Sequence, residues 1–116
     1  MKNFLIKILV SLTILNSILF FTGCQSGSST KNKEVATNVV TIKNLAFVPQ
    51  NIELKAGDQV MWVNADSAPH TVSLPNVFDS GLIKPGTSFT YTFDKPGKYE
   101  YKCSIHPTMV GVIEVK

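Results

Sequence analysis

Four side chains with metal-binding atoms lie in the second half of this sequence. Residues 103–109 (CSIHPTM) carry a thiol, an imidazole and a thioether within seven positions. The other of the chain's two histidines, His70, lies upstream. Two imidazoles, one thiolate and one weak thioether are the donors of a trigonal copper site with a long axial bond. We therefore expect one copper ion that carries single electrons, bound by His70, Cys103, His106 and Met109.

The mixture of donor types suits a metal that changes its oxidation state. Cu(I) prefers soft sulfur, whereas Cu(II) accepts imidazole readily. A site with both kinds of donor fits each state imperfectly, so little has to move when one electron is gained or lost. Cys103 must bind as the thiolate, and the metal itself lowers the pKa of its thiol.

Each of these residues also has a structural interpretation. Cys103 could be a small buried hydrophobe, His106 a surface residue, Met109 core filling and His70 a turn residue. A Cys/His nucleophile pair is the enzymatic alternative, but it leaves Met109 unexplained and needs a third, orienting group. Zinc is disfavoured because closed zinc sites use four N or S donors and methionine is a poor one. A dinuclear copper centre would need two bridging thiolates, and the domain has one cysteine.

The part of the chain that must position these donors has the pattern of a β protein. Apolar and hydroxyl residues alternate from Phe89 to Phe93, which is typical of a half-buried strand. Turn residues separate the strands, as in Lys95-Pro96-Gly97. The expected strands cover residues 39–43, 51–55, 59–64, 89–93, 99–103 and 110–115. Short strands with Gly/Pro turns predict an all-β sandwich or barrel.

This pattern also predicts where the donors lie. Cys103 ends a strand, and His106 and Met109 follow on the loop before the last strand. His70 comes from a separate loop, after the strand that contains Trp62. A sandwich can bring these two loops together at one end, where its rigidity fixes the geometry of the ligands.

The N-terminus predicts export. Two lysines precede an apolar run at residues 8–21, which is shorter than a comfortable bilayer span. We interpret residues 1–23 as a secretory signal; the alternative is a membrane anchor that stays attached. The segment Phe21-Thr22-Gly23-Cys24 resembles a bacterial lipobox, in which the cysteine is acylated and becomes the first residue, although the family usually has Leu at the position of Phe21. Ordinary cleavage nearby, leaving Cys24 free or in a disulfide, is the alternative.

Three regions follow from these patterns. Residues 1–23 are the signal, residues 24–36 are the lipidated Cys24 and a small polar tether, and residues 37–116 are one domain. From residue 37 onward seven lysines face seven acidic residues, and the chain has no arginine. We exclude nucleic-acid binding because a basic patch with interleaved aromatic residues is missing. We expect a monomer in the cell envelope, on the periplasmic or outer side.

The sequence resembles the cupredoxins, the type 1 blue copper proteins, and among them amicyanin and the shorter plastocyanin-like domains. The resemblance extends over essentially the whole domain, and the Cys-x2-His-x2-Met spacing is that of amicyanin. It implies a Greek-key β-sandwich, with His70, Cys103 and His106 as equatorial ligands and Met109 as the axial one. The other matching segments are Phe47-Val48-Pro49, Ile52-Glu53-Leu54-Lys55-Ala56-Gly57-Asp58, Val60-Met61-Trp62-Val63-Asn64, Pro69-His70, Phe78-Asp79-Ser80-Gly81 and Pro85-Gly86.

The resemblance also implies roles around the ligands. Asn64 would tie the His70 loop to Ser104, and the Pro69 carbonyl would face the copper from the side opposite Met109. Electrons would leave through His106. A small apolar patch for brief docking of a redox donor and acceptor would surround that histidine and consist of Ala68, Pro69, Ile105 and Pro107.

The function expected from these features is electron transfer without catalytic turnover. The alternative is an envelope protein for copper storage or delivery, which a Met-rich tail or several extra histidines would favour. Neither is present in the sequence. A third alternative, a β-sandwich adhesion module with an incidental cysteine, leaves the full set of donors unexplained.

Overall fold

A computed structural model describes residues 33–116 of the protein. The predicted signal and Cys24 lie outside the described residues, and the domain boundaries predicted from the sequence stay predictions. Within the described part, nine strands form two sheets. The bounds are β1 Thr37–Lys43, β2 Ala46–Val48, β3 Asn51–Leu54, β4 Asp58–Asn64, β5 Ser73–Leu74, β6 Phe78–Asp79, β7 Ser88–Phe93, β8 Gly97–Lys102 and β9 Val110–Val115.

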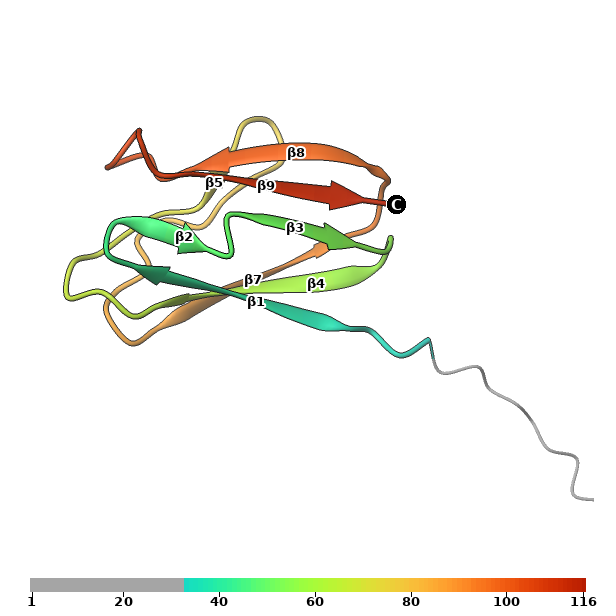
Figure 1. Cartoon of the computed structure of the whole chain (residues 1–116), viewed down its shortest axis with the longest axis horizontal. Helices are drawn as coiled ribbons and strands as arrows, with labels where there is room; N and C mark the ends of the chain where they lie inside the picture. The colour runs from blue at the N-terminus through green and yellow to red at the C-terminus, as the bar shows by residue number, and fades with distance from the viewer. Residues whose placement is uncertain (1–32) are drawn as a thin grey trace, which may run out of the picture. The chain divides into compact units, whose positions relative to one another are not determined.

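The two sheets lie face to face as two layers (Figure 1). One has the strand order β2-β1-β4-β7 and the other β3-β9-β8-β5-β6. Each sheet contains one parallel pair, β1 with β4 and β3 with β9, among antiparallel neighbours. The prediction of an all-β sandwich is therefore confirmed. Among residues 33–116, no helix is long and apolar enough to cross a bilayer.

The core between the layers is built around Trp62. Burial alternates strictly along β4, so that Val60, Trp62 and Asn64 point inward. The Trp62 ring meets the edge of Tyr101 from β8 at a centroid distance of 5.4 Å, with Phe78 and Phe89 within 6 Å. Truncation of a buried tryptophan to alanine typically costs roughly 3–5 kcal/mol, so this ring is a main contribution to stability.

The strands give the sandwich two distinct ends. At one end, Gln59 donates its N–H to the Ala36 carbonyl (2.9 Å) and Ala56 donates to the Lys116 carbonyl (3.0 Å). The C-terminus and the point where the chain enters β1 therefore lie at the same end of the sandwich, as Figure 1 shows. The other end carries the loop after β4 and the loop between β8 and β9.

Three short strands were missing from the sequence-based prediction. They are β2, β5 and β6, each of two or three residues. A segment this short carries too few alternating positions to show a period of two. The predicted strand at residues 99–103 differs at both bounds: β8 begins two residues earlier, at Gly97, and ends one residue earlier, at Lys102, so that Cys103 follows the strand.

Candidate metal centre

Two loops bring the three nitrogen and sulfur donors together. His70 lies after β4 and is held in register by Ile83: His70 donates its N–H to the Ile83 carbonyl (3.2 Å) and accepts from the Ile83 N–H (2.7 Å). The second loop is closed by Cys103, whose N–H donates to the Met109 carbonyl at 3.0 Å. Inside it, the Met109 N–H donates to the His106 carbonyl at 2.9 Å. These backbone bonds fix where each side chain begins.

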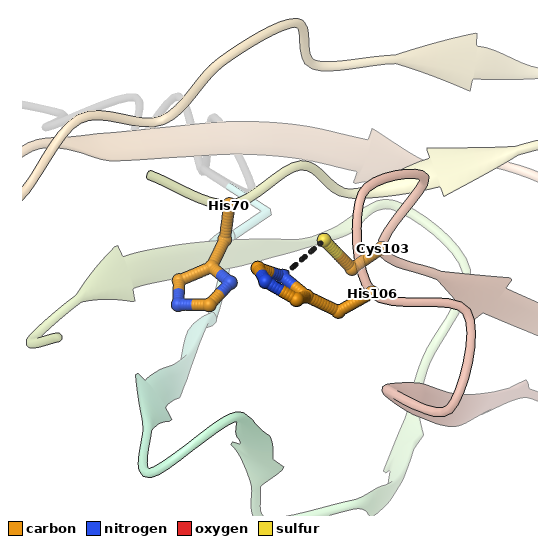
Figure 2. Close-up of side chains that lie close together, drawn as sticks. All are labelled: His70, Cys103 and His106. Atoms are coloured by element: carbon orange, nitrogen blue, oxygen red, sulfur yellow. Dashed lines mark hydrogen bonds between the residues drawn. The ribbon is translucent and has the colours of Figure 1, made fainter. Parts of the chain in front are cut away.

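The donors converge as the sequence predicted. One ligand atom each from His70, Cys103 and His106 lies within 4.8 Å of the other two. Figure 2 shows the three side chains pointing toward one another, with Cys103 Sγ 3.7 Å from His106 Nδ1. Donors that each bind one metal ion at about 2.0–2.3 Å lie roughly 3.5–4 Å apart, so this separation suits a shared metal. Cys103 and His70 are fully buried, whereas His106 is partly exposed.

The hydrogen bonds of His70 leave one ring nitrogen for a metal. Its Nε2 lies 2.9 Å from Asp66 Oδ2, so Nε2 carries the proton and donates it to the carboxylate. Its Nδ1 is buried and has no hydrogen-bond partner among the described residues. A buried polar atom without a partner is costly, and a bound cation removes that cost. The donor set and this unpaired nitrogen therefore fit a copper ion.

The environment of Cys103 favours its thiolate. The N–H of Thr71 donates to Cys103 Sγ at 3.3 Å, and Thr71 Oγ1 lies 3.8 Å from the same sulfur. Burial raises the pKa of the Cys103 thiol, but the Thr71 N–H, the His106 ring and the N–H groups of His106 and Ile105 outweigh it and bring the pKa down to about 6. The thiolate that a soft metal needs is thus favoured near neutral pH.

The expected link between Asn64 and Ser104 is wrong. Asn64 Nδ2 donates to the carbonyls of Ala68 and Ile83, both at 2.8 Å, and its Oδ1 accepts the Asp66 N–H at 2.9 Å. Asn64 does support the His70 loop, from its position at the end of β4. The N–H of Ser104 donates instead to Thr71 Oγ1 at 2.7 Å. The hydroxyl of Thr71, directly after His70, therefore makes the connection to the Cys103 loop.

Met109 is buried, and the predicted docking residues are exposed or partly exposed. The side chain of Met109 is buried, with 2% of its surface exposed. Its role as an axial ligand stays a prediction. In the patch, Pro69, Ile105 and Pro107 are exposed, and Ala68 is partly exposed. Their role in docking and the facing of the Pro69 carbonyl toward a metal also stay predictions.

Two residues of the centre were missed by the sequence analysis, Asp66 and Thr71. Both act through hydrogen bonds to a ligand, and neither belongs to a short motif. The available signal was their position in the sequence, since Thr71 directly follows His70 and Asp66 lies four residues before it in the same loop.

Comparison with known proteins finds one matching family model and several related sequences. A family model described as a cupredoxin-like domain matches residues 12–115. Amicyanin from Paracoccus versutus is 30% identical over 84 residues, which cover 67% of this chain and 64% of the relative. Chloroplastic plastocyanin from Fritillaria agrestis is 36% identical over 88 residues, which cover 62% of this chain and 53% of the relative. The chain thus spans less than two thirds of the length of both relatives.

Solved structures of copper proteins are also similar to this chain. A variant of amicyanin in its Cu(I) state superposes with a TM-score of 0.67 at 28% identity, covering 72% of this chain and 88% of the other. A copper-containing nitrite reductase from Thermus scotoductus gives 0.65 at 31% identity, but only 22% of that enzyme is covered. By its family-model match, its sandwich and its His-Cys-His cluster, this chain belongs to the cupredoxin-like domain family.

Proposed function

We propose that this protein is a type 1 copper electron carrier, which takes single electrons from one redox protein and passes them to another. The observation that carries the proposal is the buried convergence of one thiol and two imidazoles within 4.8 Å. Membership of the cupredoxin-like family supports it, as do the copper proteins among the structural neighbours.

Four side chains would bind the ion, and hydrogen bonds within the protein would hold them in place. His70, Cys103 and His106 would hold the ion, with Met109 as the weak fourth donor. Bound copper supplies a one-electron change between Cu(I) and Cu(II). The protein holds these residues with hydrogen bonds that do not depend on the metal: His70 Nε2 donates to Asp66, the Thr71 N–H donates to Cys103 Sγ, and the Met109 N–H donates to the His106 carbonyl. Such a rigid site lowers the cost of reorganisation when the charge changes.

The burial of Cys103 argues for a carrier over an enzyme. A cysteine nucleophile has to reach its substrate, and Cys103 is 0% exposed. The same burial argues against copper delivery, because handing over a metal requires access to the ligands for exchange. Only His106 of the three donors is partly exposed, so it offers the short path by which an electron leaves.

We further propose that the protein works in the cell envelope, attached through lipidated Cys24, and docks its redox partners briefly as a monomer. The support is the N-terminal sequence. Firm anchoring takes more than one acyl chain, as bacterial lipoproteins have. The wild-type protein should therefore fractionate with membranes, and Cys24→Ala should release it or stall it as the precursor. Recovery of the wild type wholly in the soluble envelope fraction would contradict the attachment.

Copper binding can be tested with soluble protein that starts at Lys33. One equivalent of Cu(II) should produce an intense blue thiolate-to-copper charge-transfer band. Cys103→Ser should abolish the band, because a hydroxyl is not an equivalent soft donor. A colourless wild type would overturn the proposal. Rapid transfer of copper to a competing metal-free acceptor, with slow electron exchange, would favour delivery instead.

A further inference from the structure

The turn between β1 and β2 has an unusual backbone. Asn44 and Leu45 connect the paired residues Lys43 and Ala46, and both have positive φ, 54° and 57°. Two left-handed residues in succession are typical of a type I′ hairpin turn, which favours Asn and Gly. Asn44 suits its position, but leucine is disfavoured in this conformation because its Cβ crowds the backbone. The turn therefore needs support from outside itself.

The carboxylate of Asp66 supplies that support. Its Oδ1 accepts the N–H of Asn44 at 2.7 Å, and its Oδ2 accepts the N–H of Leu45 at 3.1 Å. The backbone of Asp66 is itself held by Asn64, whose Oδ1 accepts the Asp66 N–H. The neighbouring Ala65 N–H donates to the Ile42 carbonyl on β1 at 2.8 Å. The carboxylate is thus fixed between the end of β4 and the turn that connects β1 to β2.

The oxygen that holds Leu45 also holds the ring of His70. Oδ2 of Asp66 accepts from His70 Nε2 at 2.9 Å, and the Asp66 side chain is only 16% exposed. A carboxylate that already receives two backbone N–H groups can rotate away only by breaking both hydrogen bonds. The ring therefore has a stationary acceptor on one side. Figure 2 shows its other nitrogen facing the sulfur of Cys103 and the ring of His106.

We propose that Asp66 is a positioning residue that joins the Asn44–Leu45 turn to His70 and holds its ring in the Nε2–H tautomer, with the Nδ1 lone pair directed at the metal centre. The inference deepens the proposed function and rests on it for the identity of the metal. The tautomer itself does not depend on a metal, so it can be measured on the metal-free protein.

The first experiment uses Asp66→Asn in the full chain. An amide has one acceptor oxygen in place of two, so it cannot serve Asn44, Leu45 and His70 together. In the metal-free wild type, ring ¹⁵N shifts should report a single Nε2–H tautomer for His70. In Asp66→Asn they should report a mixture, and the amide N–H groups of Asn44 and Leu45 should exchange faster. A pure Nε2–H tautomer in the variant would overturn the proposal.

The second measurement is the retention of copper against a chelator. Loss of an outer partner of a metal-binding histidine typically lowers metal affinity about 10–100-fold, and we expect a loss in that range for Asp66→Asn. Asp79→Asn is the matched control, because the Asp79 carboxylate also accepts a turn N–H, that of Gly81 at 2.8 Å, but contacts no ligand. Equal retention in the two variants would overturn the proposal.

A second variant separates the support that Asp66 gives to the turn from its hydrogen bond to His70. Leu45→Gly removes the unfavourable side chain from the turn, so the double variant Leu45→Gly with Asp66→Asn should fold even if the single variant does not. The proposal expects mixed tautomers in this well-folded double variant, and a pure Nε2–H tautomer would overturn it. A wild type that binds no copper but keeps the single tautomer would end the proposed function and leave the positioning role intact.

Discussion

The N–H of Ser104 donates a 2.7 Å hydrogen bond to the hydroxyl of Thr71. Thr71 follows His70, and Ser104 follows Cys103, so this bond joins the two ligand loops directly beside the donors. The same threonine donates its backbone N–H to Cys103 Sγ at 3.3 Å. One small residue thus joins the two loops and helps to favour the thiolate form of Cys103.

Thr71→Val keeps the shape of the side chain and removes its hydroxyl. We expect the variant to lose about 0.5–1.5 kcal/mol of unfolding free energy through the lost bond to Ser104. The reduction potential should fall, because a donor near the sulfur stabilises the reduced site, in which the thiolate carries more negative charge. Denaturant unfolding and voltammetry would measure the two effects. Thr71→Ser keeps the hydroxyl and should restore both values; a potential unchanged in Thr71→Val would show that the hydroxyl does not act on the sulfur.

Met109→Leu tests the predicted axial donor. The reduction potential should rise, because loss of a weak donor and added apolar bulk favour Cu(I). Stability should change by less than about 1.5 kcal/mol, since the two side chains have similar volumes. Met61→Leu, on β4, is the control and should leave the potential unchanged. Identical potentials in wild type and Met109→Leu would mean that the methionine sulfur is not a ligand.

The metal-free protein should become more stable as the pH rises from about 6 to about 9. The Cys103 pKa is about 6 in the folded state against an ordinary value of 9.0. Between these values the unfolded thiol keeps a proton that the folded state has released, so the free energy of unfolding rises with pH, by at most about 1.4 kcal/mol per unit. This stabilisation is lost as the pH falls through 6. Urea unfolding of wild type and Cys103→Ser at several pH values would test it, and a constant difference between the two would contradict it.

Electron exchange through His106 should be sensitive to charge beside it. Pro107→Glu places a carboxylate in the exposed patch without changing a ligand, so the blue band should persist. A docking penalty of about 1 kcal/mol would make exchange with partners roughly fivefold slower. Stopped-flow oxidation of the reduced protein measures this rate.

Pro96→Glu is the control for that experiment, because Pro96 is exposed beside Gly97, which pairs with Val115 at the other end of the sandwich. It adds the same charge and should exchange electrons at the wild-type rate. With seven lysines and seven acidic residues from residue 37 onward, the rate should depend only mildly on salt. Equal rates in both variants would mean that electrons leave elsewhere.

The loop that carries Cys103 and His106 could be predicted because the residues that define it lie close together in the sequence. The spacing of Cys103 and His106 and the alternation before them lie within a dozen residues of sequence, and the period of two carries the longer strands. His70 was predicted from its donor type and from the fold that the resemblance implies. The structure brings it to the other two donors.

The supporting residues could not be predicted in the same way. The turn residues that bond to the Asp66 carboxylate, Leu45 and Asn44, lie 21 and 22 residues away from it, and Ser104 lies 33 residues from Thr71. Such pairs depend on strand register, which a one-residue shift would change completely. Asn64 has the side chain expected of a buried amide, but its partners include the carbonyl of Ile83, 19 residues away, which only the folded arrangement brings near.

Both ends of the described chain lie at the end of the sandwich opposite the metal centre, beside Ala56 and Gln59. The seven residues of β4 that separate the two ends extend over about 23 Å. A fusion partner, an electrode or a membrane joined to either terminus would therefore be insulated from the centre by the full length of a strand. His106 would face away from whatever holds the protein, so that attachment and electrical contact occur at separate places.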